Sequence, residues 1–230
     1  MEATFLMGLD VGGRSGRCIL LDVNSGKVFA ANRCWEPHVA PGSGGFGYEI
    51  DTTKYKTLLA EAICEAMGKA GATPKQVAGI AVVSARHSSV LIGKDGQELA
   101  AYPNKDGQAA AEGMTQADEM GAELNERTGH FPMPIFTAAR LQWLKNSVPQ
   151  MYPQVKVVLG LSDWIAYVLT GKAATDPTQA GETCLLDLKT RKWAPDLLKK
   201  LDISPDLLPP VKEPGSKLGT LTKEAAQLFG

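Results

Sequence analysis

The fold of this chain is decided by residues 9–21, which read LDVGGRSGRCILL. An apolar run over residues 5–9 predicts a buried strand that ends at Asp10, and a second apolar run follows over residues 18–23. The loop between the two runs holds three glycines, Gly12, Gly13 and Gly16. We therefore predict a β-hairpin with a glycine-rich tip.

The chemistry of this tip favours an anion, and phosphate in particular. Glycines let backbone N–H groups turn toward one point, and such a concavity of amides binds anions. Arg14 and Arg17 would add charge-assisted donors, and Ser15 would add a hydroxyl. Asp10, at the end of the first strand, would face the same point, where a carboxylate beside phosphates can hold Mg²⁺ or its waters.

The loop also has to be distinguished from two nucleotide-binding motifs and from an ordinary hairpin. A dinucleotide fingerprint must open a helix, but the residues after Gly16 are apolar and β-type. A Walker loop needs Gly-Lys-Ser or Gly-Lys-Thr, which the loop lacks. An ordinary glycine hairpin without a ligand stays open on the motif alone.

Composition indicates a globular protein with ordinary redox and charge properties. The 230 residues are 44% hydrophobic and 21% charged, enough to bury a core as one large or two small domains. A net charge of −1 argues against nucleic acid or membrane partners. With no leader pattern and no spanning apolar run, we expect a cytoplasmic protein. The cysteines lack a C-x-x-C pair and are expected to be buried free thiols, at Cys18, Cys34, Cys64 and Cys184.

The order of elements predicts an α/β fold with a mixed sheet. A third strand over residues 28–34 extends the hairpin into an antiparallel β-meander. A helix follows, with Asp51 as its N-cap and Gly71 at its end. Residues 77–84 form a near-continuous apolar run, typical of a strand buried on both faces. The sheet is therefore expected to be flanked by helices.

Further helices and two strands are expected along the second half of the chain, one of the strands over residues 185–188. A helix is predicted over residues 107–128, with Asp106 as a candidate N-cap, and another begins at Thr137. A strand over residues 155–159 precedes a helix that Ser162 would cap and Gly171 would end.

A cluster of polar residues, Arg86, His87 and Ser88, comes directly after the apolar strand at residues 77–84. Ligand sites in open α/β sheets gather at the carboxyl ends of strands, so this cluster is a candidate substrate site. The alternative is that these side chains are polar loop groups on a solvated rim.

Short motifs recur in order along essentially the whole chain. They are GLDVG at residues 8–12 with Ser15 and Arg17, residues 84–91, NKDG at 104–107, LQWLK at 141–145, SDWIAYVLTG at 162–171, residues 186–193, and KLGTLT at 217–222. Together they resemble the amino-terminal domain of the FGGY carbohydrate kinases, the family of glycerol kinase, xylulokinase, gluconokinase and autoinducer-2 kinase. Residues 162–171, 176–177 and 210–213 resemble the autoinducer-2 kinase branch.

The resemblance implies an actin-like, ribonuclease-H-like fold in which two domains close on ATP and a sugar or polyol. It implies that Asp10 is the carboxylate associated with Mg²⁺. The matching phosphate loop comprises Gly12, Gly13, Arg14, Ser15 and Arg17, and the matching substrate positions are Arg86, His87, Ser88 and Asp106.

The chain departs from the family pattern at three positions. Gly13 stands where the family usually has Thr, and the next residue, Arg14, also departs from the pattern. Gln108 stands where many members have Arg. Losing the Thr hydroxyl would weaken a contact to the transferred phosphoryl group, which Arg14 could replace.

A larger difference concerns the catalytic base. In the family that base is an Asp in a second, carboxy-terminal domain, which also supplies the adenine pocket, so no catalytic residue is expected within residues 1–230. We expect the chain to be the amino-terminal half of an ATP- and Mg²⁺-dependent sugar or polyol kinase, with little turnover alone. A sugar-acid or glycerol kinase, a non-catalytic sugar- or partner-binding module, and a homodimer stay open as alternatives.

Overall fold

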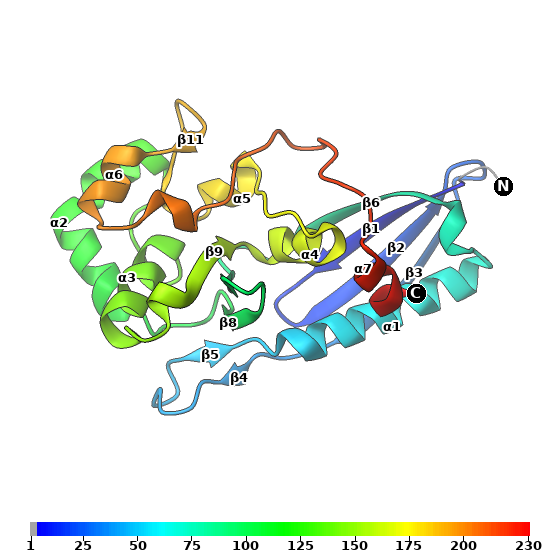
Figure 1. The fold of residues 1–230 in the computed structure, drawn as a ribbon, viewed down its shortest axis with the longest axis horizontal. Coiled ribbons are helices and arrows are strands. Elements are labelled where there is room, and N and C mark those ends of the chain that lie inside the picture. Colours follow the sequence, from blue (N-terminus) through cyan, green and yellow to red (C-terminus); the bar gives the residue numbers. More distant parts are fainter. Residues whose placement is uncertain (1–3) are drawn as a thin grey trace.

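The computed structural model describes residues 4–230. Its amino-terminal half is built on a four-stranded sheet (Figure 1), ordered β3-β2-β1-β6. Strands β1, β2 and β3 form the predicted antiparallel meander, and β6 runs parallel to β1. Their bounds are Phe5–Val11 for β1, Ser15–Asp22 for β2, Val28–Cys34 for β3 and Val77–Ser84 for β6. The mixed α/β sheet expected from the sequence is therefore confirmed.

Helix α1 (Thr52–Ala70) covers one face of this sheet. As predicted, the Asp51 side chain caps it by accepting a hydrogen bond from the Lys54 amide at 2.9 Å. Gly71 ends it in the left-handed conformation, with φ 62°. Helices α4 (Leu161–Thr170) and α7 (Lys223–Phe229) contribute to the same hydrophobic core.

The opposite face of the sheet is open, which contradicts the prediction that residues 77–84 are buried on both faces. The side chains of β6 alternate between half-buried and exposed, and Val83 is 59% exposed. Leu6 and Ile19 are also exposed, and their register on β1 and β2 places them on this same face. Strand β6 pairs with β1, and its residues Val77, Ile80 and Val82 pack against the core on one face of the sheet. No helix covers its other face within the described residues.

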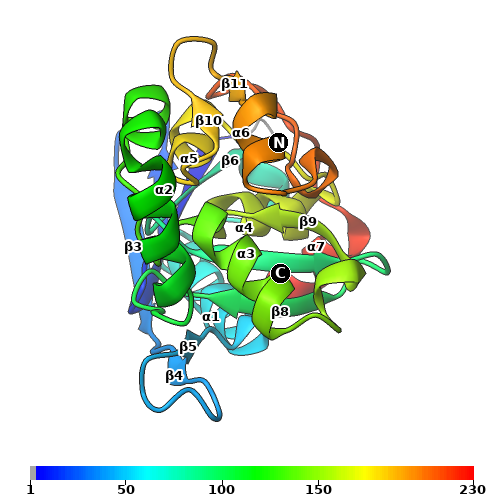
Figure 2. The same ribbon diagram turned by 90° about the vertical axis from the view of Figure 1, so that its left-hand side faces the viewer.

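The second half of the molecule packs around a three-stranded sheet ordered β8-β7-β9. Figure 2 looks from this end, with the helices α2, α3 and α6 in front and the four-stranded sheet behind them. The bounds are Ser89–Gly93 for β7, Glu98–Tyr102 for β8, Val155–Leu159 for β9, Ala110–Thr128 for α2, Thr137–Ser147 for α3 and Pro195–Lys200 for α6. Leu124, Leu141 and Leu197 join these helices in a second core cluster.

Short elements complete the fold. Two small antiparallel pairs are β4 with β5 and β10 with β11. The bounds are His38–Val39 for β4, Tyr48–Glu49 for β5, Leu186–Asp187 for β10, Lys192–Trp193 for β11, Pro177–Gly181 for α5, and Pro74–Gln76, Tyr152–Gln154 and Pro205–Leu207 for the 3₁₀ turns η1, η2 and η3.

Two predicted helix caps are wrong. Helix α2 begins at Ala110, so Asp106 lies before it and points elsewhere. Helix α4 begins at Leu161 with Gly160 as its N-cap, because the Asp163 carboxylate reaches back to accept from the Gly160 amide at 3.3 Å. Ser162 lies in the first turn instead, where its amide donates to Ser84 Oγ at 2.9 Å.

The cysteines are all free, as expected, but only two of the four are buried. Cys18 and Cys184 lie in the two cores, whereas Cys34 and Cys64 are exposed. Cys34 occupies an outward position on the edge strand β3, and Cys64 lies outside the buried stripe of α1. Local sequence does not show which side of an edge element faces solvent.

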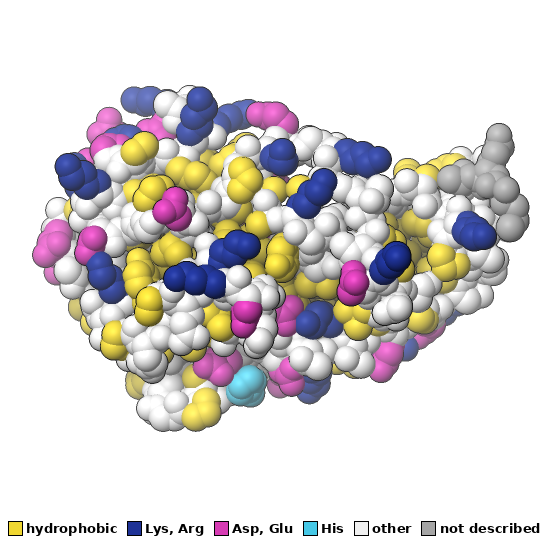
Figure 3. Space-filling model, in the orientation of Figure 1, with side chains coloured by type: hydrophobic (Ala, Val, Ile, Leu, Met, Phe, Trp, Pro, Cys, Tyr) yellow, Lys and Arg dark blue, Asp and Glu magenta, His cyan; other side chains and the backbone are white. Residues whose placement is uncertain are grey.

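The surface carries no dominant charge on the face drawn in Figure 3, where basic and acidic side chains are interspersed. Within residues 4–230, no helix is both long enough and apolar enough to span a membrane.

Candidate functional site

The candidate site lies where β1 and β6 end, near the middle of the molecule (Figure 1). These strands are parallel neighbours, with Val11 beside Ser84, and the Ala85 amide donates to the Val11 carbonyl at 2.9 Å. The glycine loop and the polar cluster that follows β6 therefore meet at one edge of the sheet. Asn104 also reaches this edge, since its Oδ1 lies 3.9 Å from where a Cβ on Gly13 would be.

The glycine loop is a tight turn held from behind by two aromatic rings. The Gly12 amide donates to the Ser15 carbonyl at 2.8 Å. Trp35 Nε1 donates to the Gly12 carbonyl at 3.0 Å, and the Tyr55 hydroxyl donates to the Gly13 carbonyl at 3.4 Å. The Trp35 and Tyr55 rings stack with centroids 4.2 Å apart. The carbonyls of the loop thus face the protein interior.

The amides of the loop are available to a ligand. Across residues 4–230, the backbone N–H groups of Gly13 and Arg14 have no hydrogen-bond acceptor. Two adjacent unpaired amides at a turn are the arrangement that binds an anion. Gly16 has a different role, since a Cβ there would lie 2.0 Å from the Trp35 ring. The third glycine of the motif is therefore needed to make room for the Trp35 ring.

The charged residues of the loop separate into two groups. Arg17 and Asp10 face each other across β1 and β2, with Arg17 Nη1 3.8 Å from Asp10 Oδ2. Both are about half exposed at the site end of the open sheet face. Arg14 turns away and forms an ion pair with Glu36, and this hydrogen bond raises the pKa of the guanidinium. The structure therefore brings together Asp10, Gly12, Gly13, Ser15 and Arg17. The Arg14 side chain pairs with Glu36 instead.

His87 is held in a strained position by groups from two distant elements. Its φ of 59° lies in the left-handed region, which is uncommon for residues other than glycine. The His87 carbonyl accepts from Arg140 Nη1 at 2.7 Å. Its Nδ1 lies 3.0 Å from Glu182 Oε2, and its ring meets Phe136 edge to face at 5.0 Å. Burial lowers the pKa of His87, and the Glu182 carboxylate opposes that shift.

The other members of the polar cluster differ in exposure. Arg86 is largely exposed, with its Nη1 4.0 Å from Glu182 Oε1. Ser88 is buried and lines a cavity of about 20 Å³ beside His87, large enough for one water molecule. Asp163 lines the same cavity, and burial raises the pKa of its carboxyl to about 7.

Asp106 is fully buried and takes part in an ion pair. Its Oδ1 accepts from the Tyr48 amide at 3.1 Å and from Gln108 Nε2 at 3.0 Å, and its Oδ2 lies 3.6 Å from Arg140 Nε. Gln108, one of the departures from the family pattern, therefore holds the Asp106 carboxylate. Whether Asp106 also contacts substrate stays a prediction.

Arg140 is the central cation of this region. It is buried in α3, where desolvation lowers its pKa to about 10 despite the nearby Asp106 carboxylate. Besides His87, it donates to the Pro103 carbonyl at 2.5 Å. Sequence reasoning missed both Arg140 and Glu182. The only local sign of Arg140 in the sequence is that it is the one charged residue in the apolar run 138–141. Glu182 has no comparable local sign.

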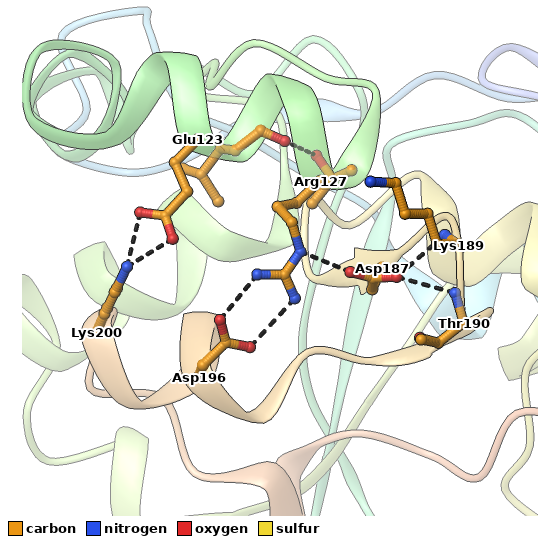
Figure 4. A network of polar contacts seen from close by, with 9 residues as sticks. Glu123, Arg127, Asp187, Lys189, Thr190, Asp196 and Lys200 are labelled. Atoms are coloured by element: carbon orange, nitrogen blue, oxygen red, sulfur yellow. Dashed lines mark hydrogen bonds and ion pairs between the residues drawn. The ribbon is translucent and has the colours of Figure 1, made fainter.

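The segment that carries Glu182 is anchored on its far side by a network of ion pairs (Figure 4). Arg127 of α2 donates through Nε to Asp187 Oδ2 at 2.6 Å and through Nη1 to Asp196 Oδ2 at 2.8 Å. Asp187 also accepts from the Thr190 amide at 2.9 Å. The network joins α2, the β10–β11 pair and α6, and so fixes the chain that follows Glu182.

Comparison with known proteins agrees with this architecture. Residues 5–230 match the FGGY family of carbohydrate kinases, N-terminal domain. Autoinducer-2 kinase of Escherichia coli K12 is 34% identical over 231 residues, covering 98% of this chain and 43% of the relative. Autoinducer-2 kinase of Salmonella choleraesuis is 32% identical over 227 residues, covering 97% and 42%. The chain thus spans less than half the length of these curated relatives.

Solved structures give the same result. Gluconate kinase from Lactobacillus acidophilus superposes with a TM-score of 0.87 at 25% identity, covering 98% of this chain and 45% of that one. Xylulose kinase from Rhodospirillum rubrum gives 0.86 at 25% identity, covering 98% and 46%. Fold and site thus define an actin-like α/β domain of the kind found in sugar kinases. The chain belongs to the FGGY family of carbohydrate kinases and corresponds to its N-terminal domain, which confirms the resemblance seen in the sequence.

Proposed function

We propose that the chain is the phosphate- and sugar-binding half of an ATP-dependent kinase that phosphorylates a sugar or polyol hydroxyl. One observation carries the proposal: the unpaired amides of Gly13 and Arg14 lie at the same sheet edge as the polar cluster at His87. Phosphoryl transfer depends mainly on positioning and on neutralising charge, and this edge offers groups for both.

On the phosphate side, the loop amides and Arg17 would bind the oxygens of the transferred group. Asp10 fits a Mg²⁺ ion, because that ion is commonly held by one carboxylate together with phosphate oxygens and water. Among residues 4–230 there is no cluster of three or more His, Cys, Asp or Glu side chains that could hold a metal ion by themselves, which agrees with a site completed by phosphate oxygens and water. The bound ion would neutralise charge on the phosphate oxygens.

On the sugar side, Arg86 and His87 would orient the substrate, whereas Ser88, also expected at the substrate, is buried beside the one-water cavity. A sugar hydroxyl needs a base to take its proton during attack. The Asp106 carboxylate is committed to Arg140, and Glu182 is committed to His87. This supports the expectation that the base comes from a second domain, so that residues 1–230 alone would turn over little.

The substrate class follows from the charges around His87. The relatives include autoinducer-2, gluconate and xylulose kinases. Arg86 would suit an anionic sugar, but Glu182 lies beside it and offsets its charge. We therefore propose a neutral polyhydroxyl substrate over a sugar acid. The homodimer and the cytoplasmic location stay predictions.

The test is ADP release by the longer protein that contains this domain, with a panel of xylulose, glycerol, gluconate and autoinducer-2. Arg17→Ala should remove most turnover while sugar binding, measured by calorimetry, persists. Lys27→Ala is the matched control, since Lys27 lies on the exposed turn between β2 and β3. A protein that binds sugar but never responds to ATP would instead be a non-catalytic module, an alternative favoured by Gly13 and the diverted Arg14.

A further inference from the structure

Glu182 places a carboxylate against one nitrogen of His87. The side chains are 14% exposed for His87 and 19% for Glu182, and Nδ1 lies 3.0 Å from Oε2. The Glu182 carbonyl also lies 3.5 Å from the same nitrogen. Two oxygens of one residue thus converge on Nδ1. Oε2 is buried and makes no hydrogen bond of acceptable geometry within the described residues, so its approach to Nδ1 is an electrostatic contact beside the hydrogen bond to the carbonyl.

This geometry determines where the imidazole proton sits. A carboxylate and a carbonyl can only accept, so Nδ1 must carry the hydrogen. Burial favours the neutral ring, and a neutral ring with hydrogen on Nδ1 has a lone pair on Nε2. In the part of the chain that the structure describes, Nε2 makes no hydrogen bond.

The rest of the ring is fixed by other elements. Arg140 holds the His87 backbone from α3, and Phe136 lies against the ring edge. His130 is the nearest other imidazole, with its centroid 6.2 Å away. Asp163 lines the same small cavity. These contacts hold the His87 backbone and the ring plane, so the state of His87 differs mainly in which ring nitrogen carries the hydrogen.

We propose that Glu182 is a positioning residue that fixes His87 as the Nδ1–H tautomer and leaves Nε2 as the acceptor for a substrate hydroxyl. The tautomer follows from this chain alone. The hydroxyl acceptor rests on the proposed function, because it assumes that a polyol binds at this edge.

The tautomer can be read directly from the 230-residue chain by ¹⁵N NMR with labelled histidine. The chain has only three histidines, so His38→Asn and His130→Asn variants assign the spectrum. Near neutral pH we expect a protonated Nδ1 and an unprotonated Nε2 for His87. A neutral ring with hydrogen on Nε2, or a ring protonated at both nitrogens, would overturn the proposal.

Two variants test the role of Glu182. Glu182→Ala removes the carboxylate and leaves only the more distant backbone carbonyl beside Nδ1, so the share of His87 that carries its hydrogen on Nε2, the usual tautomer of a free imidazole, should rise. If the alanine variant folds poorly, Glu182→Gln gives a second test. It keeps an acceptor oxygen beside Nδ1 and should therefore retain the Nδ1–H tautomer. Glu126→Ala, an exposed change on α2, is the control and should leave the spectrum unchanged. A spectrum of Glu182→Ala identical to that of the wild type would refute the proposed role.

In the longer, active protein the same variant should act on the sugar and not on the nucleotide. Glu182→Ala should raise KM for the sugar about two- to tenfold, the effect of one neutral hydrogen bond, with KM for ATP unchanged. A rise in both KM values would indicate general structural damage and count against a specific role. If no sugar is phosphorylated but the Nδ1–H tautomer is seen, the proposed function fails while the tautomer assignment holds.

Discussion

Replacing Arg140 with methionine should destabilise the domain far more than removal of any exposed cation. Arg140→Met keeps much of the volume of the side chain but leaves the fully buried Asp106 carboxylate without its cation. It also removes the donors to the His87 and Pro103 carbonyls. Breaking a buried ion pair from one side costs about 3–5 kcal/mol of unfolding free energy. For a chain of this size, that lowers Tm by roughly 6–20 °C.

The assay is urea unfolding followed by circular dichroism, with two reference variants. Lys145→Met lies on the same helix, and its ion pair with Asp202 is exposed, so its loss should cost at most about 1 kcal/mol. The double variant Asp106→Asn with Arg140→Met should recover about 1–3 kcal/mol relative to Arg140→Met alone, because no unpaired charge remains. If Arg140→Met costs no more than Lys145→Met, or if the double variant recovers nothing, the buried Asp106–Arg140 pair does not stabilise the domain.

Two further predictions concern packing and pH. Gly16→Ala should lower the free energy of unfolding by about 1–3 kcal/mol, because its Cβ would lie 2.0 Å from the Trp35 ring. Gly68→Ala, at an open position on α1, should raise the free energy of unfolding by about 0.5–1 kcal/mol in the same urea titration. The Thr190 amide and the neighbouring guanidinium lower the pKa of Asp187 to about 2, so its contribution to stability is complete above about pH 4 and is lost as pH falls toward 2. Asp187→Asn should flatten the fall in Tm over that interval, and an unchanged pH profile would contradict the assignment.

The elements that sequence predicted well carry their signals locally. The meander follows from apolar runs separated by turns, and α1 follows from its apolar period between Asp51 and Gly71. The burial of β6 was predicted wrongly because it depends on what covers the sheet from other parts of the chain. Ser162 is not the cap because Gly160, two residues earlier, takes that position and its amide donates to the Asp163 carboxylate.

The site was only half predictable for the same reason. Loop residues such as Asp10 and Arg17 are close in sequence and face each other across one hairpin. Glu182 reaches His87 from the turn after α5 and Arg140 reaches it from α3, and no spacing in the sequence links them to it. Patterns identify groups that are near each other along the chain, while partners brought together by tertiary packing leave no comparable signature.

The parallel pairing of β1 with β6 has a consequence for the order in which the molecule folds. The β1–β2–β3 meander closes through short turns, and hairpins of this kind form on the order of microseconds. Helix α1 lies between the meander and β6 in the sequence. Pairing β6 with β1 therefore brings together residues 11 and 84 across a long segment, and closing that segment costs conformational entropy. The nascent chain should therefore order the glycine loop between β1 and β2 first, and the segment that follows β6 should join it in a later and slower event.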